Sequence, residues 1–532
     1  MNSKAIIAIF AVVIVVVGGS ATFIMMNNGG SDDVTLILGT TEVTGPISTS
    51  SSSFYEQRRM IVQEPIIGFD HTSTYEKLTA ESYTSKDNVT WDVKLKSGIV
   101  WSDGEKYTSD DIKHTVDIYS IARPNVVSNI DSVIVVDETN FKIVLKKAAS
   151  ELGGVVSNMP ILPWHIWKDY KITTAEDYQK ITDIGAFIGT GPYKVSSLNS
   201  TGDELTYVFN GKFRESAPKV TKIIFKHYGQ EGAMVAALLA GEIDATYNYG
   251  TPGISASYLD KIKGASNVDY MNVITGGIPA DILFNMRNSV AADANFRNAF
   301  KYAVDYEEII KYVAPATGSV ANSGLAPPTI DGYVDTAKLA KDMTMAERYM
   351  KAYFTDHSLT WGSDKVSVDV LVWSTSDADR FTNIFNLLKE QLAKINVTLN
   401  PISAIGAEFS PTARSEKTAM TIWFMTDAAI KNYAGFAAHY ISATGTLKFV
   451  FGDSAVNDAY EQIVTDMNAA TTDAAKKSCA ERFQKFYEEN AVAIPLYWGG
   501  YIQPYSTSFT GWKCSPSSGL LSYDNLFGLQ KA

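Results

Sequence analysis

Residues 90–116 constrain the fold more than any other stretch of this chain. Apolar and charged side chains alternate at its start, with Trp91, Val93 and Leu95 interleaved with Asp92, Lys94 and Lys96. This period of two predicts a strand with one buried face and one solvated face. Asp103-Gly104 is a turn dipeptide, and Thr108 followed by Asp111 predicts the capped start of a helix. Taken alone, these turns predict an ordinary hairpin that leads into a helix. Residues 194–248, which alternate strands with a helix, indicate an α/β arrangement.

The same block resembles the signature of the family 5 extracellular solute-binding proteins, the peptide and nickel receptors of ABC importers. Further segments that resemble the family follow in the family's order: 189–195 (GTGPYKV), 221–245 (ending in GEIDA), 296–310, 494–497 (IPLY) and 511–512. The resemblance covers roughly residues 34–528. It implies an α/β fold that is periplasmic-binding-protein-like and of type II, with an extra subdomain in the first lobe and a cleft between two lobes.

The chain of 532 residues is too long for one hydrophobic core and predicts several structural units. The strand and helix patterns, taken with the resemblance, predict this division: an N-terminal segment and linker at 1–33, lobe I at 34–69, 186–285 and 490–532, its extra subdomain at 70–185, and lobe II at 286–489. The chain therefore leaves lobe I and returns to it. We expect the two crossings, which would form a hinge, near Asn285 and Glu489.

The N-terminus predicts a membrane anchor. Residues 5–26 contain no charged side chain, and 22 residues of helix at about 1.5 Å per residue span a bilayer core of roughly 30 Å. Lys4 precedes this run while Asp32 and Asp33 follow it, which places the body on the extracellular face. A cleaved signal peptide, with Gly19-Ser20-Ala21 near the cleavage site, is the alternative.

Composition and motifs exclude several function classes. The net charge of −12, from 46 basic and 58 acidic residues, argues against a nucleic-acid partner. The sequence has no HExxH, GxSxG or Walker A motif, and its six histidines lack metal-ligand spacing. We therefore expect no enzyme, no cofactor and no metal site. Cys479 and Cys514 are either one disulfide or two free thiols.

The resemblance also implies ligand-binding residues. In peptide-binding members an aspartate after an apolar, Trp-containing strand pairs with the ligand's amino group. Asp427 is the only carboxylate in the matching stretch, 420–433, and Trp423 is its neighbouring aromatic wall. The stretch carries Ala428-Ala429 where the family has Asp-Pro.

Other candidates come from position and chemistry. Arg380 and Arg414 lie in or beside the variable region of lobe II and have the planar fork that binds a carboxylate with two hydrogen bonds. Trp373 and Tyr247 lie at predicted strand ends, where aromatic walls of a cleft are placed. Thr41 and Glu42 match the family's polar first loop, which lines the cleft from lobe I.

These observations predict an extracytoplasmic receptor that captures a small solute, an oligopeptide above all, and hands it to ABC permease and ATPase subunits. A nickel chelate or an oligosaccharide is the alternative ligand. A surface-anchored hydrolase is the alternative of a different class, and it would need two converging carboxylates or a nucleophile with its base.

Overall fold

The structure is a computed structural model, and the part of the chain that it describes comprises residues 34–42, 54, 57–72, 74–248, 253–274, 278–328, 333–372, 378–404, 408–425, 455–470, 472–515 and 519–532. Residues 34–532 form one compact unit. The predicted anchor at 5–26 lies outside the described residues. Within the described ranges, no helix has the length and apolarity needed to cross a membrane.

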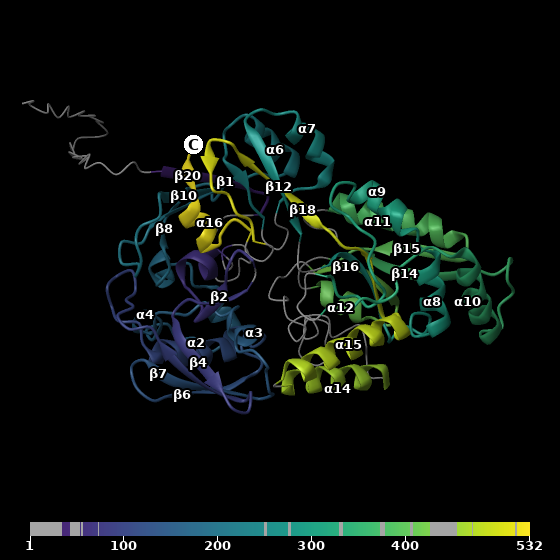
Figure 1. Cartoon of the computed structure of the whole chain (residues 1–532), viewed down its shortest axis with the longest axis horizontal. Coiled ribbons are helices and arrows are strands. Elements are labelled where there is room, and N and C mark those ends of the chain that lie inside the picture. The colour runs from purple at the N-terminus through teal and green to yellow at the C-terminus, as the bar shows by residue number, and fades with distance from the viewer. Residues whose placement is uncertain are drawn as a thin grey trace, which may run out of the picture. The chain divides into compact units, whose positions relative to one another are not determined.

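The first lobe is built on a seven-stranded sheet with the order β12-β18-β11-β1-β10-β9-β8 (Figure 1). Its strands are β1 (Val34–Thr40), β8 (Tyr193–Leu198), β9 (Glu204–Phe209), β10 (Val220–His227), β11 (Ala245–Thr246), β12 (Val268–Ile274) and β18 (Gly500–Ser506). The central strand β1 pairs in parallel with β10 and β11. Helices α6 (Glu231–Leu239) and α7 (Leu259–Lys263) bury apolar side chains against this sheet.

The extra subdomain confirms the prediction for residues 90–116. Its sheet has the order β4-β5-β7-β6, formed by Ala80–Ser85, Thr90–Leu95, Asn140–Leu145 and Ile130–Val135. The apolar positions of β5 are buried and its charged positions are exposed. Helix α2 (Ser109–Ala122) begins after Thr108, and the Thr108 backbone N–H donates to Asp111 Oδ2 at 2.8 Å. This sheet and the first-lobe sheet share one hydrophobic cluster, so the subdomain is an extension of lobe I.

The second lobe is built on a five-stranded sheet with the order β15-β14-β16-β13-β17. Its strands are β13 (Ile278–Phe284), β14 (Val366–Val372), β15 (Val397–Ile402), β16 (Thr418–Met425) and β17 (Ala493–Tyr497). One face packs on α8 (Ala294–Ala303), α9 (Tyr306–Val313), α10 (Met343–Asp356) and α11 (Ala378–Ala393), and the other on α12 (Phe409–Arg414), α14 (Ala455–Ala469) and α15 (Asp473–Asn490). In Figure 1 α9 and α11 lie above the strands of this sheet, and α12, α14 and α15 lie below them.

Shorter elements complete the described part of the chain. They are the π-helical turn η1 (Arg58–Val62), the strands β2 (Ile67–Phe69), β3 (Tyr75–Lys77), β19 (Phe509–Thr510) and β20 (Gln530–Lys531), the helices α3 (Gly153–Val156), α4 (Trp164–Trp167), α5 (Ala175–Gln179) and α16 (Tyr523–Gly528), and the 3-10 turns η2 (Ile184–Phe187) and η3 (Ala256–Tyr258). Cys479 and Cys514 are free thiols, and they belong to different hydrophobic clusters, one in each lobe.

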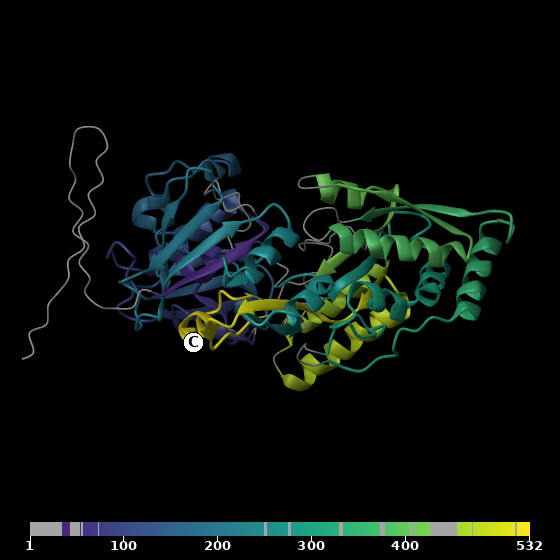
Figure 2. The same cartoon turned by 90° about the horizontal axis from the view of Figure 1, so that it is seen from above.

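The two crossings between the lobes were predicted near Asn285 and Glu489, but the strand pairing places them elsewhere. β13 and β17 pair with each other and belong to the second sheet. The chain therefore crosses once between the end of β12 at Ile274 and the start of β13 at Ile278, and once at Trp498–Gly499, between β17 and β18. Figure 2 shows the yellow C-terminal ribbon passing from one sheet to the other. Asn285 lies at the far end of β13, where its amide donates to Thr418 O at 2.9 Å. Periodicity cannot assign β13, because an apolar strand has the same pattern in either sheet.

Candidate functional site

In the first lobe, the crossings leave from the edge where the parallel strands end. β1, β10 and β11 run in the same direction and end at Thr40, His227 and Thr246. β18 runs antiparallel to β11, so its first residue, Gly500, lies toward the same edge. The last residue of β12, Ile274, pairs with Gly500.

The second lobe has the same arrangement. β14, β15 and β16 are parallel and end at Val372, Ile402 and Met425. β13 is antiparallel to both β16 and β17, so Tyr497, the last residue of β17, lies at this same edge. The crossings thus join the two sheets at the carboxyl ends of their parallel strands. In open α/β sheets ligands bind outside these ends, which makes the two edges the candidate site.

The edge of the first sheet carries a polar network around Asn248, two residues after β11. Its side-chain oxygen accepts hydrogen bonds from Thr40 Oγ1 at 3.2 Å, from Thr41 N at 2.9 Å and from Thr41 Oγ1 at 3.0 Å. The Glu42 N–H donates to Thr40 Oγ1 at 3.1 Å. The predicted residues Thr41 and Glu42 are therefore held at the edge. Asn248 was missed in the sequence; its signal is a polar residue directly beyond a buried strand.

Arg380 contacts residues of both sheets. It lies in the first turn of α11, and α11 follows the carboxyl end of β14. Its Nη1 donates to the hydroxyl of Tyr497 at 3.1 Å, and its guanidinium carbon lies 5.3 Å from the ring centre of Tyr501, a residue of β18. A guanidinium at this distance from an aromatic ring makes a cation–π contact. Arg380, which is predicted to bind a carboxylate of the ligand, thus lies at the carboxyl edge of the second sheet and beside a crossing.

Trp423 lies near the end of β16 and is half-buried. Its ring centre lies 4.9 Å from that of Phe409 and 5.4 Å from that of Phe424, with the latter pair stacked. Asp281 pairs with Trp423 across β13 and β16 and is fully buried. Trp423 therefore forms part of an aromatic group at the edge of the second sheet.

Four predicted residues have other placements. Asp427 and Trp373 lie outside the described residues. Tyr247 is 3% exposed, and its ring lies edge-to-face with Phe225 at 5.4 Å, so it belongs to the core of lobe I and not to a wall. Arg414 is exposed at the end of α12, just before β16 begins. A strand of eight residues separates it from the carboxyl edge, or about 23 Å at 3.3 Å per residue.

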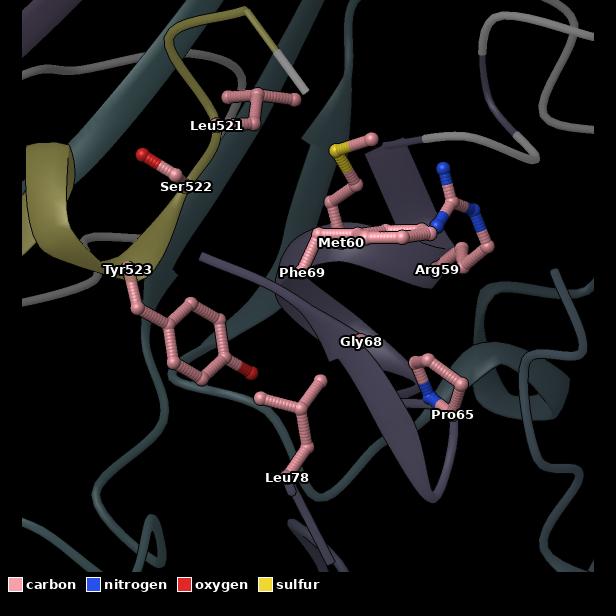
Figure 3. A pocket seen from close by; sticks show the side chains of 9 residues that line it. All are labelled: Arg59, Met60, Pro65, Gly68, Phe69, Leu78, Leu521, Ser522 and Tyr523. Carbon is pink, nitrogen blue, oxygen red and sulfur yellow. The ribbon is translucent and has the colours of Figure 1, made fainter. Parts of the chain in front are cut away.

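Two pockets among the described residues lie away from these edges. The first holds about 20 Å³, room for little more than one water molecule. In Figure 3 Tyr523 and Leu78 lie on one side of it and Met60 and Phe69 on another. The second, of about 200 Å³, lies on the extra subdomain and is lined by Glu105, Lys106, Thr108, Asp110, Asp111, Trp164, His165 and Lys168. No group of three or more metal-binding side chains occurs in the described ranges.

Beside the first pocket lies a buried ion pair. Arg214 donates from Nη1 to Glu64 Oε2 at 2.7 Å and from Nη2 to Glu64 Oε1 at 2.9 Å. The hydroxyls of Thr190 and Tyr523 also donate to this carboxylate, at 2.8 and 2.5 Å. Burial alone raises the pKa of the Glu64 carboxyl, but the charge and hydrogen bonds of Arg214, together with the hydrogen bonds from Tyr523 and Thr190, outweigh it and hold that pKa below its usual value.

Close packing of two backbone segments explains the Gly-Thr-Gly sequence at residues 189–191. A Cβ atom on Gly189 would lie 1.7 Å from the carbonyl oxygen of Val62, and one on Gly191 would lie 2.6 Å from that of Ile61. Only glycine permits this close approach of the two backbones, while Thr190 between them reaches Glu64. The segment is thus structural, and it ties η1 to the start of β8.

Comparison with known proteins identifies the family. Residues 74–445 match the family model described as bacterial extracellular solute-binding proteins, family 5. The chain belongs to this family. The glutathione-binding protein GsiB of Escherichia coli is 26% identical over 350 residues, which is 62% of each chain, so less than two thirds of that relative is matched. Family 5 members bind solutes and are not enzymes, in agreement with the absence of catalytic motifs from the sequence.

Solved structures share the fold. The oligopeptide-binding protein AppA of Bacillus subtilis, in complex with a nonapeptide, has a TM-score of 0.75 at 18% identity, over 94% of this chain and 99% of AppA. NikA of Brucella suis, in complex with Fe(III)-EDTA, has a TM-score of 0.78 at 18% identity, over 94% and 100%. The prediction of a two-lobed, periplasmic-binding-protein-like α/β fold is confirmed.

Proposed function

We propose that this protein is the substrate-binding protein of an ABC importer, and that it captures an oligopeptide between its lobes and delivers it to the permease and ATPase subunits. The observation that carries the proposal is the meeting of both sheets' carboxyl ends at the two crossings. A relative named for binding glutathione, itself a tripeptide, and a similar fold solved with a nonapeptide support this ligand class.

The chemistry of a peptide fits the residues assigned to the site. A free peptide carries an ammonium at one end and a carboxylate at the other. We assign Asp427 to the ammonium and Arg380 to the carboxylate, each as a charge-assisted hydrogen bond. Trp423 and Trp373 would pack against the ligand from lobe II, and the loop of Thr41 and Glu42 would face it from lobe I.

The second crossing has a defined place to bend. Trp498 is fixed to lobe II, because its backbone exchanges two hydrogen bonds with Ser319, at 2.7 and 2.9 Å. A Cβ on Gly499 would lie 2.5 Å from the carbonyl oxygen of Thr317, so this glycine also packs on lobe II. Bending therefore falls between Gly499 and Tyr501. A solute that contacts both lobes only when they are closed shifts the equilibrium toward closure.

Binding without turnover is the test. The purified full chain would be titrated with trialanine, glutathione, nickel(II)-histidine and maltotriose, with the melting temperature and the recovered ligand measured. Stabilisation by a peptide at saturation, with the peptide recovered intact, is the expected result. Preference for the nickel complex or the sugar would overturn the peptide assignment, and cleavage of any probe would overturn the receptor role.

We also propose that residues 5–26 hold the body at the extracellular face of the cell membrane. The length and apolarity of this segment and the charges beside it support the proposal. Membrane fractions of cells that produce the full chain should retain it after washing with alkaline carbonate. A chain whose mature form begins after Ala21 and washes off would indicate a cleaved signal peptide.

A further inference from the structure

The orientation of the Asn248 amide is determined by its partners. Three donors converge on Oδ1: the hydroxyls of Thr40 and Thr41, and the backbone N–H of Thr41. A backbone N–H only donates, so the atom that faces it must be the oxygen and not the NH₂ group. The NH₂ group is therefore on the arm of the amide that points away from the loop of Thr41.

This NH₂ group is left with hydrogens to donate. Asn248 is 7% exposed, and the contacts of the described residues give its Nδ2 no acceptor. Within the described residues, Nδ2 is not among the buried side-chain atoms that lack a hydrogen-bond partner, so it is open to solvent at the edge, where a ligand can replace water. Gln503, in the neighbouring strand β18, shows the contrast: its Nε2 donates to Thr246 O at 2.8 Å and to Pro504 O at 3.1 Å. Gln503 joins strands, whereas Asn248 keeps its donors at the edge.

We propose that Asn248 donates its side-chain N–H groups to a backbone carbonyl oxygen of the bound peptide. The inference rests on the proposed function and assigns to lobe I a residue that reads the peptide backbone. The NH₂ group is uncharged, so it matches a neutral carbonyl oxygen, whereas a carboxylate is better matched by a charged donor such as a guanidinium. Contact with the backbone carbonyl is independent of the ligand's side chains, so it contributes affinity for peptides of many sequences.

The variant Asn248→Asp tests the NH₂ donors of Asn248 separately from the hydrogen bonds that its Oδ1 accepts. An aspartate still accepts from Thr40 and Thr41, so the loop keeps its conformation, but it presents an acceptor with negative charge where the NH₂ group was. The matched control is Asn267→Asp, which adds the same charge to an exposed position just before β12, at the opposite end of that strand from Ile274. Asn248→Ala removes the donors without adding charge.

Calorimetric titration of the full chains with trialanine and glutathione decides the matter. All variants are measured about 20 °C below the lowest melting temperature among them, so that each is folded. We expect Asn248→Asp and Asn248→Ala to bind at least tenfold more weakly than the wild type, and Asn267→Asp to bind within twofold of it. Wild-type affinity in either Asn248 variant would overturn the inference and leave the proposed function standing. A wild-type chain that binds neither probe would overturn both.

Discussion

Replacing Glu64 by Gln tests whether the buried ion pair holds lobe I together. Glutamine keeps the shape of the side chain but removes its charge. The Arg214 guanidinium, whose side chain is 15% exposed, then lies in lobe I without its buried counterion. The hydroxyls of Thr190 and Tyr523 lose a charged acceptor at the same time.

The expected loss is large because the partner left behind is buried. Breaking a buried pair by removing one member costs about 3–5 kcal/mol, since the remaining charge is uncompensated. Unfolding entropies near 2.1 cal/mol/K per residue give roughly 1 kcal/mol/K for the body, residues 34–532. The melting temperature should therefore fall by about 3–5 °C if the body unfolds in one transition.

Differential scanning calorimetry and urea unfolding measure the effect. Glu215→Gln is the matched control, because this carboxylate lies 3.7 Å from Arg214 Nε but is 56% exposed, and pairs of that kind contribute about 0–1 kcal/mol. The double variant Glu64→Gln/Arg214→Met removes the unpaired charge and should recover most of the loss. A Glu64→Gln chain within 1 kcal/mol of the wild type would refute the assignment of Glu64 and Arg214 as a tie within lobe I.

The remaining predictions concern pH, the core and the ligand. Because the folded pKa of Glu64 is lowered, its contribution is present above the unfolded value of about 4.3 and is lost as the pH falls through the folded pKa, so the stability difference between wild type and Glu64→Gln should narrow in urea titrations below about pH 4. Trp101→Ala opens a cavity at a fully buried position and should cost about 3–5 kcal/mol by urea unfolding. Arg380→Lys should weaken trialanine binding about tenfold but leave binding of trialanine amide unchanged, as judged by calorimetry. Asp427→Ala should weaken binding of trialanine about tenfold, whereas binding of N-acetyl-trialanine, which lacks the ammonium group, should be the same in this variant as in the wild type.

The sequence predicts well what neighbouring residues decide. The strand Thr90–Leu95, the cap formed by Thr108 and Asp111 and the buried Trp101 depend on alternation and turn chemistry over a few residues, and the structure confirms them. The lobe boundaries were misplaced because every residue of β13 is buried. A continuous apolar run shows no periodicity that would assign it to one sheet or the other.

The site was predicted only in part for a related reason. Thr41 and Asn248 are 207 residues apart in sequence, and only the parallel pairing of β1 with β11 brings their loops together. In the sequence, Arg414 and Arg380 are equivalent candidates, because both are arginines in or beside the variable region of lobe II. The direction of β16 separates them, because Arg414 lies before the strand's amino end and Arg380 lies beyond the carboxyl end of the parallel strand β14.

The ligand-binding role proposed for Arg380 would link ligand binding to closure. Its contact with Tyr501 joins an α11 residue to a lobe I strand just beyond the proposed bend between Gly499 and Tyr501. A ligand carboxylate would draw the same guanidinium toward the space between the lobes. Shifting a two-state equilibrium from 1:99 to 99:1 requires about 5.5 kcal/mol of differential affinity, while a dissociation constant of 1 μM corresponds to about 8.2 kcal/mol. A peptide bound with a dissociation constant of about 1 μM therefore has enough binding free energy to close the lobes if about two thirds of that energy comes from contacts made only in the closed state. Tyr501→Ala, which removes the ring but leaves Tyr497 as partner, should change the open–closed balance seen by small-angle scattering before ligand is added, and unchanged scattering would separate Arg380 from the hinge.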